Sequence, residues 1–154
     1  YSKQGGAKLK FFKLLWECFT VWNIPKATEE ELKNAKIIIA LSFGASGKNN
    51  ILPPGKSNAI IGFKTIGACK EYNLPVIAQW EIADYIGPEY YKYKIEGEQR
   101  KYLDTRIALL DAKKFVIKKF DGQNRVIIIC HPDHAWRIKK LSERIKNKSA
   151  PIIK

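Results

Sequence analysis

Cysteine is scarce in this chain, and no two cysteines have the spacing of a metal or redox motif. The three cysteines are Cys18, Cys69 and Cys130, so their number is odd and no Cys-x-x-Cys occurs. This pattern fits neither a zinc ribbon nor a secreted disulfide framework, and we expect a reducing, cytoplasmic location. All three thiols lie among apolar residues, where a buried and unreactive cysteine is the usual outcome.

Long hydrophobic runs are also missing. A membrane-spanning helix needs about 20 consecutive apolar residues, and no stretch of this sequence approaches that length. The 154 residues are 45% hydrophobic and 28% charged, which is the composition of an ordinary globular protein with its own core. We therefore predict one domain over residues 1–154, with a helical segment at 1–35 and a βαβ core at 36–154.

Arginine is rare although the chain is strongly basic. Lysine and arginine number 28 against 15 acidic residues, a formal net charge of +13, yet only 5 of the 28 are arginine. Specific recognition of phosphates and bases favours the guanidinium of arginine over the ammonium of lysine. A basic module for nucleic acid or an anionic surface is therefore the alternative function rather than the first. It would use Lys113, Lys114, Lys118, Lys119, Lys139, Lys140, Lys146 and Lys148.

The N-terminal region predicts a helix over residues 7–22. Leu9, Phe12, Trp16 and Phe19 recur there at helical spacing and form an apolar stripe. The stripe packs either on its own domain or against another surface, as a homo-oligomer face or a membrane-surface helix.

Three runs of β-branched and aliphatic residues predict strands. They lack the alternation of a half-exposed strand, which indicates burial on both faces of a parallel sheet. Helical patterns separate them, so the connections are right-handed crossovers. The predicted fold is a three-layer α/β/α, Rossmann-like domain with a mainly parallel sheet. The strands are residues 36–42, 76–79 and 125–130, and the long helices are residues 57–72, 100–120 and 132–146.

Shorter elements complete the prediction. Thr28 and Glu31 have the spacing of a capping box, which starts a short helix that ends near Ala35. Residues 80–86 predict a helical turn, and the tyrosine-rich residues 90–98 are left open, with an excursion or a lid as options. Two long helices carry a stripe of large apolar side chains, the usual sign of a face packed on the core. These stripes are Ile60, Phe63, Ile66 and Cys69 in one helix, and Leu103, Ile107, Leu110, Lys114 and Ile117 in the other.

The loop after the first predicted strand contains Gly44, Ser46 and Gly47. In doubly wound sheets, ligands bind outside the carboxyl ends of the strands, where the strand order reverses. Glycines let backbone N–H groups converge on an anion, and a serine hydroxyl suits the same ligand. The sequence matches neither the P-loop nor the dinucleotide-binding glycine pattern. The loop is therefore either a phosphate or carboxylate cradle or a plain surface loop.

The turn after the third predicted strand contains both histidines of the chain. With Pro132 at the first helical position, His134 and Arg137 share one face of the next helix. We predict that His131, Asp133, His134 and Arg137 contact a small anionic or nucleotide-like ligand, which the helix N-terminus also favours. The structural alternative is helix capping by Asp133 and an ion pair between Asp133 and Arg137.

His134 is the candidate acid–base residue if the domain is an enzyme, a question that the sequence leaves open. Its imidazole titrates near neutral pH and follows a strand at its carboxyl end. No G-x-S-x-G motif supports a nucleophilic serine. No metal site is predicted either, because His131, Asp133 and His134 are neighbours within one turn and seldom converge on one ion.

A third group of candidate ligand-binding residues lies around the start of the helix predicted at 100–120. Glu98, Asp104 and Thr105 can face the same crevice as the two histidines. Carboxylates at a helix start are also common capping residues, and that alternative stays open.

Together these pieces resemble the YdcF-like superfamily, the group that includes the SanA and ElyC envelope-related proteins. The family pattern begins with a buried strand that ends in a Gly-rich loop, followed by a helix and a second strand. A Glu then precedes an Asn-Thr pair that opens a long helix. The pattern ends with a strand that leads into a turn with His, two further residues and Arg. The corresponding pieces here are residues 37–47, 57–72 and 76–79, Glu98 with Asp104 and Thr105, and residues 126–130 with His134 and Arg137.

Four features depart from that family pattern, among them the extra residue between Glu98 and Thr105 and the absence of the Glu-Asn that follows the threonine. Gln79, Trp80 and Glu81 replace a double glycine after the second strand, and Asp104 stands where asparagine is usual. The resemblance implies a Rossmann-like fold and a small nucleotide-like ligand, with S-adenosylmethionine as one candidate cofactor.

Overall fold

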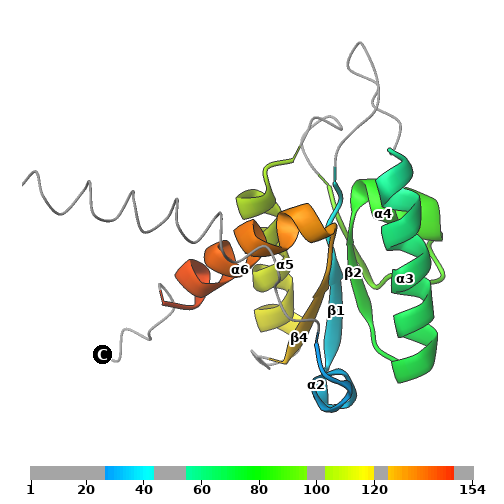
Figure 1. Cartoon of the computed structure of the whole chain (residues 1–154), viewed down its shortest axis with the longest axis horizontal. Helices are drawn as coiled ribbons and strands as arrows, with labels where there is room; N and C mark the ends of the chain where they lie inside the picture. Colours follow the sequence, from blue (N-terminus) through cyan, green and yellow to red (C-terminus); the bar gives the residue numbers. More distant parts are fainter. Residues whose placement is uncertain (1–26, 44–54, 97–102, 120–124, 148–154) are drawn as a thin grey trace, which may run out of the picture.

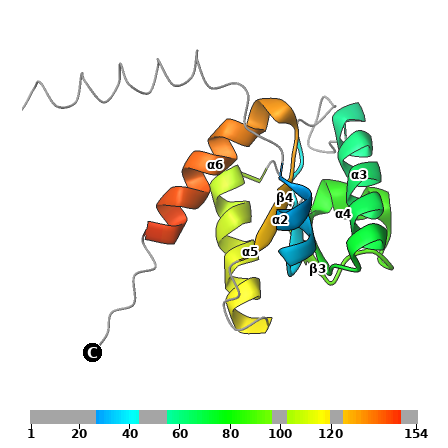
Figure 2. The same ribbon diagram turned by 60° about the horizontal axis from the view of Figure 1, so that its bottom comes forward.

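The computed structural model describes residues 27–43, 55–96, 103–119 and 125–147, with side chains up to Arg144. Within these residues four parallel strands form one sheet in the order β3-β2-β1-β4. Helices cover both faces of the sheet (Figures 1 and 2), which confirms the three-layer α/β/α, Rossmann-like fold. The helix predicted at 7–22 lies outside the described residues.

Nine helices and strands follow one another along the described ranges. They are α2 (Glu29–Asn34), β1 (Ile37–Ala40), α3 (Lys56–Tyr72), β2 (Val76–Gln79), α4 (Trp80–Ile86), β3 (Tyr93–Ile95), α5 (Thr105–Lys119), β4 (Val126–Ile129) and α6 (Pro132–Asn147).

The central strand β1 is enclosed on both faces, as its unbroken apolar run predicted. Ile37, Ile39 and Leu41 pack against α5 and α6, whereas Ile38 and Ala40 pack against α3 and α4. All five side chains are at most 5% exposed. Successive side chains of a strand point to opposite faces, so a strand covered by helices on both sides needs apolar residues at every position.

The strand β4 is less buried than the sequence predicted. Every residue from Val126 to Ile129 is half-buried, because β4 lies at the edge of the described sheet and has only β1 as a neighbour. At the opposite edge, Tyr93–Ile95 forms β3. The ambiguous tyrosine-rich segment therefore contains a strand of the sheet.

Two predicted helix starts are confirmed. Thr28 Oγ1 accepts a hydrogen bond from the Glu31 amide at 3.2 Å, and the Glu31 carboxylate accepts one from the Thr28 amide at 2.8 Å. These reciprocal bonds form the capping box of α2. Pro132 begins α6, where a missing N–H group costs nothing because that position has no partner within the helix.

The helix α3 packs through only half of its predicted stripe, because Ile66 and Cys69 are half-buried against the core and the other two residues are exposed. Ile61 is 3% exposed in the interface, whereas Ile60 and Phe63 are 59% and 67% exposed. A Cβ atom added to Gly62 would lie 2.5 Å from Cδ1 of Tyr85 in α4, so glycine permits this close approach of the two helices. The buried face of α3 is centred on Asn58, Ile61, Gly62 and Thr65.

The helix α5 differs from prediction in its start and in its buried face. It begins at Thr105, because Asp104 caps it: Asp104 Oδ1 accepts from the Arg106 amide, and the Asp104 carbonyl accepts from the Ala108 amide. The side chains of α5 that face the core are Thr105, Ala108, Leu109, Ala112 and Val116. Three residues of the predicted stripe, Ile107, Leu110 and Ile117, are instead 55%, 37% and 54% exposed.

No helix within the described ranges has both the length and the apolar character to cross a membrane.

Candidate ligand site at the carboxyl ends of the strands

The carboxyl ends of β1 and β4 lie side by side where the strand order reverses (Figure 1). After β1 the chain continues to α3 on one face of the sheet, and after β4 it continues to α6 on the opposite face. Ligands of doubly wound sheets bind in the crevice between such diverging connections. The residues that follow β1 and β4 are therefore the first candidates for functional side chains.

Phe43 joins the two strand ends. Its ring stacks on the ring of His131, with centroids 4.0 Å apart and an angle of 7° between the planes, and it meets the ring of His134 edge-on at 4.8 Å. The Phe43 amide donates a hydrogen bond of 2.8 Å to Oδ1 of Asn58, a fully buried residue of α3. The end of β1 is thereby held against both α3 and the turn that follows β4.

His131 caps the start of α6. Its carbonyl accepts a hydrogen bond of 2.9 Å from the His134 amide, and its Nδ1 accepts one of 3.3 Å from the Asp133 amide. A neutral His131 ring therefore carries its hydrogen on Nε2. Oδ2 of Asp133 lies 3.5 Å from the same Nδ1.

Arg137 and Asp104 form an ion pair between α6 and the start of α5. Nη2 of Arg137 lies 3.7 Å from Oδ2 of Asp104, and the two side chains are 53% and 50% exposed. Arg137 and Asp104 were both predicted to contact the ligand, and the structure brings them together. Thr105, the next residue along the chain, is buried. An exposed ion pair contributes about 0–1 kcal/mol. Arg137 can therefore exchange Asp104 for a ligand anion at little cost.

The environment of His134 keeps its imidazole neutral near pH 7. Burial lowers the pKa of His134 below its ordinary value, the positive charges of Arg137 and His131 lower it further, and Asp133 opposes them. Nδ1 of His134 is buried and has no hydrogen-bond partner among the described residues. The unpartnered Nδ1 is itself shielded from solvent.

Buried polar side chains also gather at the neighbouring ends of β1 and β2. Oε1 of Gln79 accepts a hydrogen bond of 3.2 Å from the Ser42 amide, and both side chains hydrogen-bond the carboxyl group of Glu81. Glu81 is 1% exposed. Burial raises the pKa of Glu81, and its hydrogen bonds, led by the one from its own amide, offset part of that shift. The Glu81 carboxyl group is therefore held toward its neutral form.

We expect the substitution Glu81→Gln to raise the stability of the protein relative to wild type as the pH increases. The raised pKa means that the stability contributed by protonated Glu81 is fully present below its ordinary pKa of 4.5 and is lost as the pH rises through the folded-state value. Glutamine has a similar shape and does not ionise, so the variant avoids that loss. Urea unfolding from pH 4 to pH 8 measures the difference.

The control for this substitution is Glu30→Gln on α2, where the glutamate is exposed. It should leave the pH dependence of unfolding close to that of wild type. Parallel pH profiles for wild type and Glu81→Gln would show that Glu81 ionises in the folded protein as it does in the unfolded chain.

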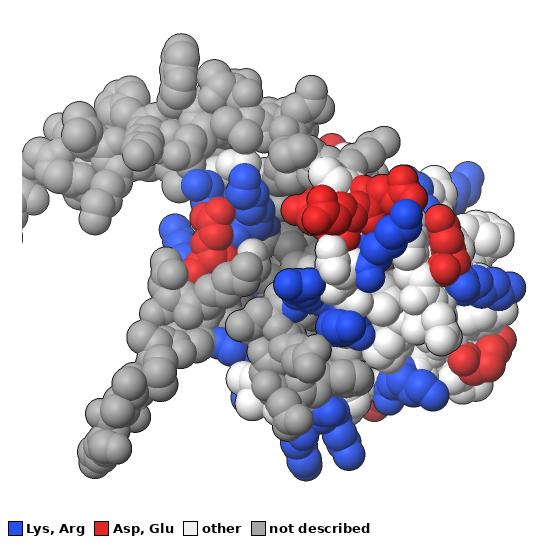
Figure 3. All heavy atoms as spheres, turned by 90° about the horizontal axis from the view of Figure 1, so that it is seen from below, with Lys and Arg blue, Asp and Glu red and all other residues white. Residues whose placement is uncertain are grey.

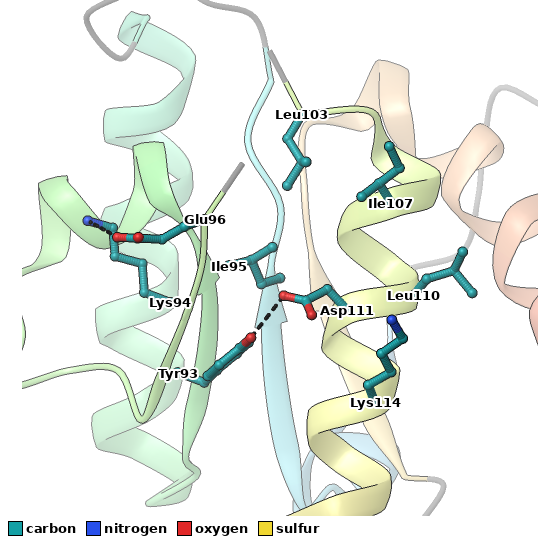
Figure 4. Close-up of a pocket in the computed structure, with 9 residues that line it drawn as sticks. All are labelled: Tyr93, Lys94, Ile95, Glu96, Leu103, Ile107, Leu110, Asp111 and Lys114. Carbon is teal, nitrogen blue, oxygen red and sulfur yellow. Dashed lines mark hydrogen bonds and ion pairs between the residues drawn. The ribbon is translucent and has the colours of Figure 1, made fainter. Parts of the chain in front are cut away.

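A separate hollow of about 530 Å³ lies between β3 and α5 (Figure 4). Tyr93 and Asp111 point toward each other across it, and the Tyr93 hydroxyl donates a hydrogen bond of 3.0 Å to Oδ2 of Asp111. Apolar side chains of Leu103, Ile107 and Leu110 lie above and beside this bond. None of the described residues that line the hollow was predicted to bind the ligand. We therefore place the candidate site at the carboxyl ends of β1 and β4.

Four predicted ligand-binding residues lie outside the described part of the chain. Gly44, Ser46 and Gly47 belong to the loop after β1, and Glu98 belongs to the segment before α5. Within the described ranges, no group of three or more histidine, cysteine, aspartate or glutamate side chains is arranged to hold a metal ion.

The predicted site did not include Phe43, Asn58, Gln79 or Glu81. Gln79 and Glu81 carry a usable signal, because they follow the second predicted strand directly, where the carboxyl-end rule applies. Asn58 carries none, since it is one polar residue within a helix, and only the packing of α3 against β1 brings it to the Phe43 amide.

Comparisons with known proteins found no match to this chain. No protein-family model matches the chain, and neither the curated proteins nor the solved structures contain a significant match to it.

Proposed function

We propose that this domain binds a small anionic, nucleotide-like ligand across the carboxyl ends of β1 and β4. The observation that carries the proposal is the contact of Phe43 with His131 and His134 at this edge, beside the half-exposed Arg137. Aromatic and imidazole rings offer flat surfaces to a base. The guanidinium of Arg137 offers two parallel hydrogen bonds to a phosphate or carboxylate group.

The start of α6 adds to the attraction for an anion. The helix dipole makes the first turn of α6 partly positive, although the Asp133 and His134 amides already donate to His131. The helix has 16 residues and begins directly after β4. We expect Gly44, Ser46 and Gly47 to supply further donors and Glu98 to add a ligand contact.

The resemblance to YdcF-like proteins supports a ligand with an adenosine part, and S-adenosylmethionine is the cofactor that it suggests. If the bound molecule is also a substrate, we assign acid–base chemistry to His134. Its lowered pKa leaves the imidazole ready to accept a proton at neutral pH. Such catalysis typically contributes about 10²–10⁴-fold in rate.

The alternative, a nucleic-acid or anionic-surface module, gains no support from the face shown in Figure 3. Acidic side chains stand among the basic ones over this face. Nucleic-acid binding domains instead gather their lysines and arginines into one basic patch or stripe. The first turn of α2 is itself acidic, with Glu29, Glu30 and Glu31.

We expect the substitution Arg137→Gln to weaken binding of adenosine 5′-monophosphate by about tenfold or more. A hydrogen bond to a charged group contributes about 1.5–3 kcal/mol, and about 1.4 kcal/mol corresponds to a factor of ten in Kd. Thermal shift and titration calorimetry with this nucleotide, S-adenosylmethionine and inorganic phosphate measure the effect.

The matched control is Lys139→Gln, which removes the same charge from an exposed position on α6. It should leave nucleotide affinity within about twofold of wild type, because screening weakens the effect of a distant surface charge. Equal losses in the two variants would reduce the role of Arg137 to general surface charge. Mixed-sequence RNA that binds at about 200 mM salt, with no response to the small ligands, would favour the alternative function.

A further inference from the structure

The strand β4 forms an edge of the described sheet and consists only of apolar residues. One valine and three isoleucines make up Val126–Ile129, and all four are half-buried. Alternate residues of a strand direct their backbone groups to opposite sides, and within the described ranges only β1 lies beside β4. Natural proteins cover or charge such an edge, because a bare apolar edge pairs with other chains. The outer side of β4 therefore needs a cover.

A hollow of about 570 Å³ lies beside this edge, where β4 meets the helix α2 (Figure 2). On the side of β4 it is lined by Val126, Ile127 and Ile128, and on the side of α2 by Glu30 and Glu31, among other residues. No residue of α2 is buried within the described part of the chain. An occupant of this hollow needs apolar side chains for β4 and positive charge for α2.

The residues that precede α2 in the sequence meet both requirements. Residues 7–22, which lie outside the described ranges, are predicted to form a helix with an apolar stripe of large side chains. Residues 1–26 contain five lysines and one glutamate, so the segment is basic where the first turn of α2 is acidic. The segment and the hollow are therefore complementary in both polarity and charge.

The connection to α2 keeps this segment close to the hollow. Ala27 itself lines the hollow, and residues 23–26 alone separate it from the predicted helix. An extended chain spans about 3.3–3.6 Å per residue, so the helix must end within about 18 Å of Ala27. A helix over residues 7–22 is about 24 Å long, whereas the four residues of β4 span only about 13 Å. The segment is therefore near enough and long enough to cover the edge.

We propose that residues 7–22 dock in this hollow as a helix, with the apolar stripe against β4 and lysines toward Glu30 and Glu31. The edge of β4 is then covered by its own chain, and not by a second copy or a membrane surface. This inference is independent of the proposed ligand. Ala35 and Arg125, which also line the hollow, precede β1 and β4, so the hollow lies at the amino ends of the strands.

Cysteine cross-linking of the full chain tests this placement, because Cys18 lies within the docking segment. Asn34→Cys puts a second thiol at the exposed end of α2, where Asn34 lines the hollow. A short bismaleimide should join Cys18 to this thiol within one chain. Mass spectrometry of the peptides distinguishes that link from links to Cys69 or Cys130. The matched control is Glu96→Cys, an exposed position next to β3 at the opposite edge of the sheet, which should react with Cys18 much more slowly.

Two further substitutions, each combined with Asn34→Cys, should slow the cross-link several-fold. Trp16→Ser removes a large side chain from the apolar stripe, and Glu30→Lys reverses a charge beside the hollow. Glu89→Lys, an equal change of charge at an exposed position beyond α4, should leave the rate close to that of Asn34→Cys alone. Circular dichroism and thermal unfolding establish that each variant is folded.

Three results would overturn the proposal. Equal rates of reaction for Asn34→Cys and Glu96→Cys would mean that the segment has no preferred place beside α2. A link that forms only between chains, when wild type is mixed with a chain carrying Cys18→Ser and Asn34→Cys, would mean that a second copy covers the edge. Absence of any link, with sedimentation of the protein on anionic phospholipid vesicles, would assign the apolar stripe to a membrane surface.

Discussion

Replacing Ile38 by alanine should lower the free energy of unfolding by about 2–5 kcal/mol, the range for large-to-small changes in a closed core. Ile38 is 0% exposed and lies opposite Val76 of β2 and Ile127 of β4. Neighbouring strands on both sides, with helices over its own face, leave little room for collapse around the missing atoms. Urea unfolding followed by circular dichroism measures the loss.

Ile60→Ala is the matched control for Ile38→Ala. The side chain has the same shape, but on α3 it is 59% exposed. This change should therefore alter stability by no more than about 0.5 kcal/mol, as surface substitutions usually do. A large loss at Ile60 with a small loss at Ile38 would mean that α3 packs on the sheet through the opposite face.

The second large effect is expected from Asn58→Ala, which should destabilise the protein by about 1–3 kcal/mol. Removing the Asn58 side chain leaves the Phe43 amide without its acceptor, and an unmet buried hydrogen bond costs that amount. Alanine forms helices more readily than asparagine, and this gain in stability offsets a small part of the loss. Because the Phe43 ring stacks on His131, the histidine ring signals in NMR spectra should shift in the same variant.

Ser57→Ala provides the comparison for Asn58→Ala, since Ser57 is the preceding residue of α3 and is only half-buried. It should change neither the stability by more than about 0.5 kcal/mol nor the histidine signals. Unchanged histidine signals in Asn58→Ala would show that Phe43 keeps its place without the bond from its amide.

Local patterns predicted where helices and strands occur and which way the chain runs. The apolar run at β1 indicated a strand enclosed on both faces, and the helices between strands required parallel pairing. The capping box at Thr28 and the proline at the start of α6 marked two helix starts correctly. These signals are short-range, since each depends on residues within a few positions of one another.

The carboxyl-end rule also predicted which candidate residues lie near one another. His131 and His134 were expected at the end of β4, and Asp104 was expected to face the same crevice as Arg137. The structure brings Asp104 and Arg137 together across two helices. The rule succeeds because the carboxyl ends of parallel strands all lie at one edge of the sheet.

The sequence by itself determined the α/β order and the parallel sheet, and it predicted the edge of the sheet at which the candidate residues lie. Only the tertiary structure decided which faces of α3 and α5 are buried. The helix α3 approaches α4 closely at Gly62 and leaves Phe63 exposed, whereas α5 packs through Ala108 and Ala112 and leaves Ile107 exposed. It also decided that β4 lies at the edge of the sheet that the described residues form. The buried contacts of Asn58 and Glu81 arose in the same way, since a hydrogen bond between distant residues exists only once packing has placed both partners.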